Sequence, residues 1–208
     1  MAELPIATDE PPEERGFDYD RTVALSDGVF AIALTLLVLN IGVPGHVVHG
    51  KLGSGLLDHD TEFQSYAVSF AVIALLWVRH HTFFRDLEKI DGRITLLNLA
   101  YLGFVAFLPY PTRILGLYGD EPASVALYAI TVAIIATIGG IMRTYALRAG
   151  LLSGQGRTEL ARREHWAIGP AIFLGSIPVA FVSAKLAELL WLLLLVPGLR
   201  WGRALRRR

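Results

Sequence analysis

The sequence predicts an all-α integral membrane protein with six transmembrane helices. Of its 208 residues, 53% are apolar and only 18% are charged, which is too little charge for the surface of a soluble domain of this size. The apolar residues form long blocks, and several blocks approach the roughly 20 residues with which a helix crosses a bilayer. Lys and Arg gather between alternate blocks instead of spreading evenly along the chain.

The apolar blocks define the expected helices in order. They cover residues 22–41, 62–84, 94–118, 123–147, 166–182 and 184–201. Gly42 and Pro44 end the first block. Pro109 and Pro111 predict a kink or break inside the third block, because proline removes a backbone donor and disfavours helix in the residue before it.

The division between the fifth and sixth helices rests on Lys185 and Glu188, which we expect to mark a turn. Without a turn there, the count falls to five. Basic residues decide between the two, since cytoplasmic connections are enriched in Lys and Arg. The second-to-third connection, the fourth-to-fifth connection and the C-terminal tail are all basic. Six spans place these three segments and both termini in the cytoplasm, whereas five would put the basic tail outside.

The remaining composition excludes several function classes. The chain has no cysteine, so disulfides, thiolate metal sites and cysteine nucleophiles are absent. Its formal net charge is zero, and it therefore lacks the global basic field of a nucleic-acid-binding protein. The acidic N-terminus does not have the basic start of a cleaved signal peptide. We expect residues 1–20 to form a disordered cytoplasmic tail, 21–201 the six-helix membrane domain, and 202–208 a basic cytoplasmic tail.

Asp27 is the most informative single residue, because it follows Ser26 in the first turns of a membrane helix. An ionisable group at membrane depth is costly and usually pairs within the protein or faces water. A Ser-Asp pair near a helix start is also a common cap. The residues alone therefore leave a capping role and a functional role equally open.

Ile32, Leu36 and Leu39 follow the spacing i, i+4, i+7 and share one face of the first helix, with Thr35 on the same side. Such a stripe most often reflects ordinary helix packing. The alternative is that symmetry copies of the helix form stacked apolar rings, which constrict a pore by making an ion shed its water.

Several landmarks carry a family resemblance. The first helix contains Arg21, then Leu25-Ser26-Asp27-Gly28, an apolar run, and Thr35 eight residues after Asp27; later positions are Trp77, His80, Phe84, Asn98 and Leu108-Pro109. Over about residues 21–115 this pattern resembles the transmembrane protein 175 family, which comprises lysosomal potassium channels and their bacterial relatives. Leu25 departs from the pattern, since the family has an aromatic residue before Ser-Asp.

The resemblance implies a potassium-selective or weakly selective cation channel of a bacterial cell membrane, without a Thr-Val-Gly-Tyr-Gly filter. It implies a homotetramer whose first helices line a central pore. Ile32 would be the narrowest point, Leu36 and Leu39 the next apolar rings, and Thr35 the hydroxyl implicated in potassium preference. Potassium would be the permeant ion, the lipid bilayer and further copies of the chain the partners, and no cofactor or metal is expected.

The same resemblance assigns a structural polar network to Arg21, Ser26, Asp27, His80 and Asn98, which would tie the first helix to its neighbours. We favour this role over a proton relay, because buried polar groups need partners and contacts between helices supply them. His80 could still titrate near neutral pH, so a pH effect on conduction is a further hypothesis.

Three alternatives stay open. The main one is a proton-coupled secondary transporter that uses Asp27 and His80 and has broken helices in matching halves. A non-conducting scaffold is the second. An intramembrane enzyme is the least favoured, since neither a nucleophile signature nor a metal triad accompanies the Asp-His pair. His46 and His49 lie three residues apart in a connection and are read as solvated side chains more readily than as metal ligands.

Overall fold

The computed structural model describes residues 13–43, 53, 59–154, 156 and 167–192. Its helices are α1 (Glu13–Leu36), the 3-10 turn η1 (Leu37–Asn40), α3 (Asp60–Arg85), α4 (Gly92–Phe107), α5 (Pro109–Leu117), α6 (Pro122–Ala149), α8 (Ile168–Ala180) and α9 (Ala184–Leu192). The prediction of an all-α chain is confirmed. Four stretches are long and apolar enough to cross a membrane: Tyr19–Asn40, Asp60–Arg85, Gly92–Leu117 and Pro122–Ala149.

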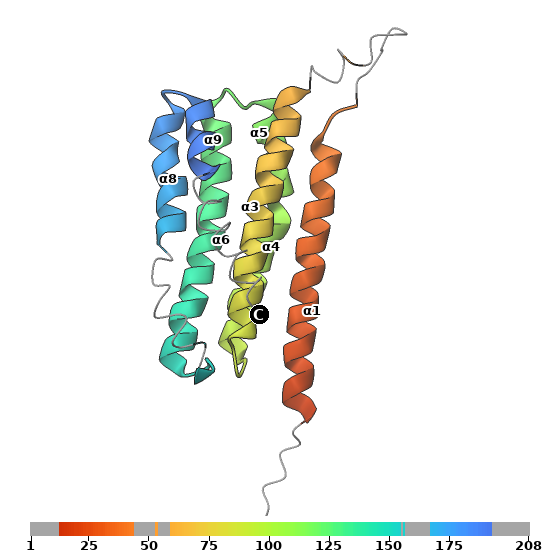
Figure 1. The fold of residues 1–208 in the computed structure, drawn as a ribbon, viewed down its shortest axis with the longest axis vertical. Coiled ribbons are helices and arrows are strands. Elements are labelled where there is room, and N and C mark those ends of the chain that lie inside the picture. Colours follow the sequence, from red (N-terminus) through yellow and green to blue (C-terminus); the bar gives the residue numbers. More distant parts are fainter. Residues whose placement is uncertain (1–12, 44–52, 54–58, 155, 157–166, 193–208) are drawn as a thin grey trace, which may run out of the picture.

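The long helices stand side by side in a bundle, with α1 at one edge and α8 at the other (Figure 1). Helix α1 packs on α3 and α4, α6 packs on α4 and α8, and α9 packs on α8. Because α1 lies at the edge, part of its surface is not covered by the rest of the chain. This arrangement leaves one face of the first helix available to a neighbouring molecule or to lipid.

The expected break in the third segment is present at Leu108, between α4 and α5. Pro109 and Pro111 have no backbone N–H, so the helical ladder is interrupted at this point. The Leu108 amide instead bonds the carbonyl of Val105 at 3.2 Å, and the ladder resumes where Thr112 donates to Leu108 at 3.1 Å. The two pieces stay nearly continuous, because Leu108 itself keeps right-handed helical angles.

Two boundaries differ from the sequence prediction. Helix α1 begins at Glu13, so residues 13–20 are helical and not part of a disordered tail. The turn between the fifth and sixth segments is present, but it lies between Ala180 and Ala184. Lys185 and Glu188 therefore do not form the turn; they lie inside α9. Residues 193–201 of the expected sixth segment fall outside the described residues.

Glu188 explains why a charged residue is tolerated inside α9. Its side chain is buried, and one carboxylate oxygen accepts a hydrogen bond from Gln64 Nε2 on α3 at 3.0 Å. A buried carboxylate needs such a partner, because burial without one is costly. A charge pattern alone marked Glu188 as a turn residue, whereas its role is a contact between helices.

Asp91 organises the opposite end of the bundle. One of its carboxylate oxygens accepts the backbone N–H of Ile94 at 2.8 Å and caps α4, and the other accepts the hydroxyl of Tyr145 on α6 at 2.5 Å. Nearby, the backbone of the α3–α4 turn pairs with the end of α6, where Glu88 donates to the carbonyl of Leu151 at 2.9 Å. These bonds fix α4 to α6 at the end where both meet the turn.

We expect Asp91→Ala to lower the free energy of unfolding by about 1–2 kcal/mol, because it removes a helix cap and the acceptor for Tyr145. Thermal unfolding in detergent, followed by circular dichroism, measures this change. Glu88→Ala removes the same charge from an exposed position on the same turn and is the matched control. Equal losses in the two variants would contradict the role of Asp91.

The same site predicts a pH dependence. Burial acts to raise the pKa of Asp91, but the hydrogen bonds from Tyr145 and from the Ile94 amide outweigh it and hold the pKa below its ordinary value. A carboxyl whose pKa falls on folding stabilises the fold above its unfolded pKa of about 3.9 and loses that contribution as pH drops through the folded value. The stability gap between wild type and Asp91→Asn should therefore close below about pH 4.

Candidate functional site

Helix α1 has two distinct faces. Phe30, Ala33 and Leu37 are at most 1% exposed and pack into the core of the bundle. Ile32, Leu36 and Leu39 are 60%, 41% and 73% exposed, and Thr35 is exposed beside them. The four residues predicted to line a pore thus share the face that the rest of the chain leaves uncovered.

Thr35 has a defined hydrogen-bonding state on this face. Its hydroxyl donates to the carbonyl of Ile32 one turn earlier, at 2.9 Å. Because the hydroxyl hydrogen is used within the helix, the oxygen can only present its lone pairs to anything that approaches the face. Those lone pairs suit a cation.

Three of the five predicted network residues form a connected chain of hydrogen bonds. Asn98 Nδ2 on α4 donates to Ser26 Oγ on α1 at 3.1 Å, and Asn98 Oδ1 faces His80 Nε2 on α3 at 2.8 Å. The Ser26 hydroxyl donates a hydrogen bond to the carbonyl of Thr22 at 2.8 Å. All three side chains are buried, so the chain joins α1, α3 and α4 inside the bundle.

The donor and acceptor in each of these bonds follow from the atoms that Asn98 offers. Asn98 uses its nitrogen toward Ser26, which leaves its oxygen for His80, so His80 Nε2 must carry the hydrogen in this bond. The His80 ring stacks on Phe84 with centroids 4.4 Å apart and also contacts Phe30 and Tyr101. An amide does not readily pass protons on, because its nitrogen keeps its hydrogens. The geometry favours a structural tie over a proton relay.

Asp27 has a different partner. Its carboxylate oxygen Oδ1 accepts the indole N–H of Trp77 on α3 at 2.8 Å, and Trp77 stacks on His81. Asp27 and His80 are therefore held by separate groups and do not form the direct acid–base pair that a coupled transporter would use. Arg21 is exposed at the entrance of an open cavity between the start of α1 and the α3–α4 turn, together with Lys89 and Asp91.

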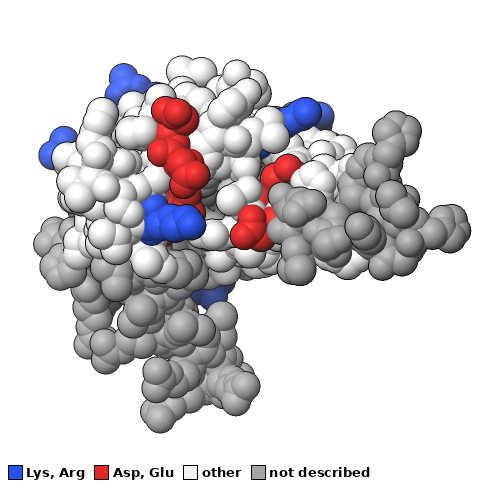
Figure 2. Space-filling view, turned by 90° about the horizontal axis from the view of Figure 1, so that it is seen from above, with Lys and Arg blue, Asp and Glu red and all other residues white. Residues whose placement is uncertain are grey.

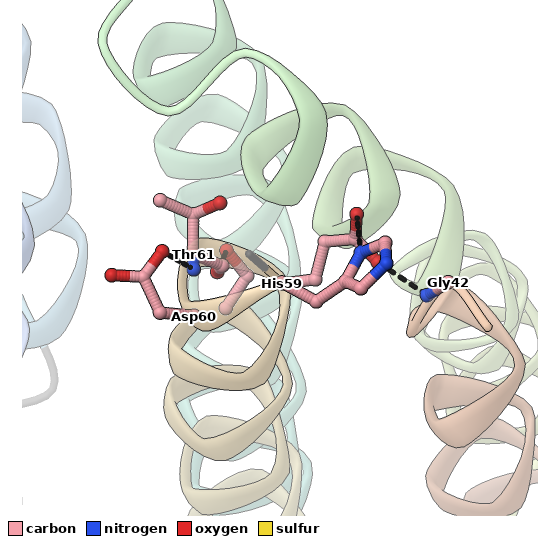
Figure 3. Close-up of polar contacts among 6 residues, drawn as sticks. Gly42, His59, Asp60 and Thr61 are labelled. Atoms are coloured by element: carbon pink, nitrogen blue, oxygen red, sulfur yellow. Dashed lines mark hydrogen bonds and ion pairs between the residues drawn. The ribbon is translucent and has the colours of Figure 1, made fainter. Parts of the chain in front are cut away.

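The far end of α1 is fixed by two contacts that the sequence did not predict. Asn40 Nδ2 donates to the carbonyl of Pro109 at 2.8 Å, at the α4–α5 break. The Gly42 amide donates to the Glu62 carboxylate, whose other oxygen bonds His59 Nδ1 at 2.9 Å, at the start of α3 (Figure 3). Asn40 and Glu62 were visible only as polar residues at the ends of apolar blocks.

Gly42 lets the side chains of His59 and Glu62 come close to the backbone at this contact. A Cβ at position 42 would lie 2.8 Å from Cε1 of His59 and 3.0 Å from the Glu62 carboxylate, closer than side chains normally approach. The sequence identified Gly42 only as the end of a helix. In the structure it is the point where the backbone after η1 meets α3.

The described residues contain no group of three or more His, Asp or Glu that could hold a metal ion. His46 and His49 lie outside them. Figure 2 shows the end of the molecule at which α3 and α6 begin, where acidic side chains form a row that ends beside a basic side chain. The helix ends at this face include Asp60, Glu62, Asp120 and Glu121.

Comparisons with known proteins agree on one family. A family model described as the endosomal/lysosomal potassium channel TMEM175 matches residues 21–109. A potassium channel of Streptomyces collinus is 35% identical over 173 residues, covering 80% of this chain and 84% of that protein. A potassium channel of Chamaesiphon minutus is 34% identical over 186 residues, covering 86% and 91%. The endosomal/lysosomal proton channel TMEM175 of Gallus gallus is 30% identical, and the match spans 33% of its length.

A solved structure gives the same answer at the level of the fold. The crystal structure of a lysosomal potassium-selective channel TMEM175 homologue from Chamaesiphon minutus superposes with a TM-score of 0.78 at 32% identity, covering 88% of this chain and 97% of that chain. The region that the family model matches, residues 21–109, includes the uncovered face of α1 and Ser26, His80 and Asn98. The chain belongs to the TMEM175 family.

Proposed function

We propose that this protein is a potassium-permeable cation channel of the cell membrane, assembled as a homotetramer with the uncovered face of α1 around a central pore. The observation that carries the proposal is the division of α1 into a buried face and an exposed apolar face. An exposed apolar face that bears Ile32, Leu36 and Leu39 could contact lipid as well as line a pore. The chain's membership of a family with potassium channels at 34–35% identity supports the pore over the lipid contact.

The constriction is proposed at Ile32, with Leu36 and Leu39 as further rings. Four copies of one apolar side chain around an axis exclude water, and an ion must shed its hydration to pass. Thr35 lies between these rings, and its outward lone pairs supply the polar atoms that favour a cation at this level. The family and the relatives named above are ion channels and not enzymes.

We also propose that the chain crosses the membrane six times, with both termini in the cytoplasm. The end bearing the α3–α4 turn and the end of α6 carries Arg85, Lys89, Arg93 and Arg148, and the opposite end carries Arg113 and Lys185. By the positive-inside rule the first end is cytoplasmic. Helix α9 starts at the other end and heads back toward it, as a sixth span with a cytoplasmic C-terminus requires (Figure 1). The acidic face of Figure 2 would then be outside, where it concentrates cations.

A flux assay in liposomes tests the function. Vesicles loaded with potassium and diluted into sodium-free, potassium-free buffer acidify inside only if potassium leaves and protons enter. With a protonophore present, a potassium channel gives acidification that a pH-sensitive dye reports. With valinomycin alone, acidification needs a proton path in the protein itself. With neither ionophore, it needs potassium–proton exchange.

We expect acidification with the protonophore, as for a passive potassium path. Acidification with neither ionophore would show that the protein passes both potassium and protons; a rate that saturates with the potassium concentration would then assign a coupled transporter using Asp27 and His80. Acidification with valinomycin alone would assign proton conduction, which the names of the vertebrate relatives make the second candidate. No acidification in either ionophore arm would indicate a non-conducting scaffold.

A further inference from the structure

Gly28 lies in the middle of the uncovered face of α1, and the constriction proposed above gives it no role. It is two residues from Ser26 and two residues from Phe30, and each of these side chains is only 1% exposed. Two residues turn a helix through slightly more than half a circle, so position 28 faces away from the bundle. Thr35, two turns further along α1, is exposed on the same line.

The space in front of Gly28 is open. Apart from its chain neighbours and the backbone of its own helix, no atom of the described residues would lie within 4 Å of a Cβ at this position. A Cβ at Gly139 of α6, by contrast, would lie 3.3 Å from the Tyr101 ring, so that glycine allows two helices to approach. Gly28 also keeps an ordinary negative φ, since the positive φ among the described glycines is at Gly150. Neither packing nor backbone geometry in the described chain calls for a glycine at position 28.

Gly28 precedes Ile32 by one helical turn, on the side toward the start of α1. In a ring of four copies, neighbouring helices meet along the flanks of their uncovered faces, and the middle of each face points at the axis. The ring of atoms at position 28 is therefore wider than the ring at Ile32 by a whole side chain on every copy. Water stays in the wider section, whereas the apolar ring excludes it.

Asp27 sets the charge beside this wider section. Its side chain is exposed on the flank of α1 next to Gly28, where its Oδ1 accepts the indole N–H of Trp77 at 2.8 Å. Four copies around an axis would form a ring of carboxylates, which favours cations in a channel. Arg21 lies on the same side of α1 but seven residues before Gly28, about 10 Å along the helix. Asp27 is thus the nearer charge.

We propose that Gly28 forms a wide, water-filled section of the pore, in which a potassium ion keeps its hydration beside the Ile32 ring. This inference rests on the proposed channel with α1 around its axis, and it adds a residue that sets the length of the dry section. A side chain at position 28 would extend the apolar section by one more turn. The ion would then lose its water over a longer path, which raises the barrier to conduction.

Substitutions at position 28 test this role in the liposome flux assay. Gly28→Leu should lower potassium efflux on the order of tenfold or more, and Gly28→Ala should lower it less. Gly28→Ala should also keep or raise the thermal unfolding midpoint, because alanine favours helix more than glycine does and its Cβ has open space. A loss of flux without a loss of stability is the signature that packing alone would not produce.

Gly175→Leu is the matched control for these variants. Gly175 is an exposed glycine of α8 whose Cβ position is equally open, and α8 lies at the edge of the bundle opposite α1 (Figure 1). The control should keep the wild-type flux. Wild-type flux in Gly28→Leu, or an equal loss in both leucine variants, would overturn the proposal. Dissociation of the oligomer or a lower unfolding midpoint in Gly28→Ala would also overturn it, since Gly28 would then serve close packing between copies.

Thiol modification tests the water-filled section without relying on conduction. The chain has no cysteine, so Gly28→Cys introduces a single thiol, and Gly175→Cys is its control. In liposomes with reagent on both sides, a membrane-impermeant trimethylammonium methanethiosulfonate should modify Gly28→Cys but not Gly175→Cys, because the reactive thiolate forms only where water reaches it. The sulfonate analogue should react more slowly at position 28, since Asp27 disfavours an anion there. Mass spectrometry counts the modified chains.

The two assays separate this inference from the channel itself. Potassium efflux by the wild type with an unmodified Gly28→Cys would overturn the water-filled section and leave the channel standing. A modified Gly28→Cys without wild-type efflux would overturn the channel, and with it the role of this section for potassium. Faster reaction of the sulfonate analogue would overturn the preference for a cation beside Asp27.

Discussion

Ile32→Asn should raise passive potassium flux and weaken discrimination against sodium. In the proposed tetramer, four isoleucines form a ring that repels water, and the barrier to an ion is largely the cost of shedding its hydration there. Asparagine has a similar length but offers donors and acceptors, so water can enter and the ion keeps part of its shell. A gain on the order of tenfold in flux corresponds to a barrier lowered by about 1.4 kcal/mol.

The liposome assay measures the rates of potassium and sodium efflux with the protonophore present. Ile141→Asn is the matched control, because Ile141 on α6 is 46% exposed and carries the same side chain outside the proposed pore. If both variants leak equally, the effect comes from a polar residue on the membrane surface and not from a pore ring. An unchanged flux in Ile32→Asn would remove Ile32 from the ion path.

The sequence predicted the four long apolar helices of the described residues well, because their main determinant is local. A block of apolar residues must form a helix in a bilayer, where every backbone polar group needs an internal partner. The break at Leu108 followed in the same way from Pro109 and Pro111. The start of α1 could not be found like this, since residues 13–20 are mostly polar and hydropathy detects only the apolar part of a helix that continues beyond it.

In the candidate site too, the local pattern on α1 was predictable from the sequence, whereas the contacts between helices were not. The spacing of Ile32, Leu36 and Leu39 predicted that they share one face of α1, but it favoured ordinary packing and did not show that the rest of the chain leaves this face uncovered. The pore stays a proposal that the family relation supports. The polar contacts depend on which helices meet, and Ser26 and Asn98 are 72 positions apart. The residues were recognisable, but their partners were not: Asp27 pairs with Trp77 and not with His80.

Asn98→Leu should destabilise the protein by about 1–3 kcal/mol, although the leucine side chain is branched at the same position. The change removes both cross-helix bonds at once and leaves the Nε2 hydrogen of His80 buried without its acceptor. For a chain of this length, each 1 kcal/mol lowers the unfolding midpoint by roughly 2–4 °C. Hydrogen exchange should also rise at α1 amides near Ser26, because α1 loses its tie to α4.

Thr131→Val is the control, since Thr131 is equally buried but its hydroxyl bonds only the Leu127 carbonyl of its own helix, at 2.8 Å. A double-mutant cycle with Ser26→Ala then isolates the bond between α1 and α4. Ser26→Ala strands the Asn98 amide, and adding Asn98→Leu removes that stranded donor, so the double variant should cost less than the two single losses together. Additive losses would show that Ser26 and Asn98 do not share a bond.

A cost for Asn98→Leu no larger than that for Thr131→Val would show that the hydrogen bonds joining α1, α3 and α4 contribute nothing beyond local helix contacts. Helix α1 packs mainly on α3 and α4. Loss of these hydrogen bonds would leave the Asp27–Trp77 bond as the polar contact described above that holds the middle of α1 to α3, so directional hydrogen bonds would fix its depth in the bundle less strictly.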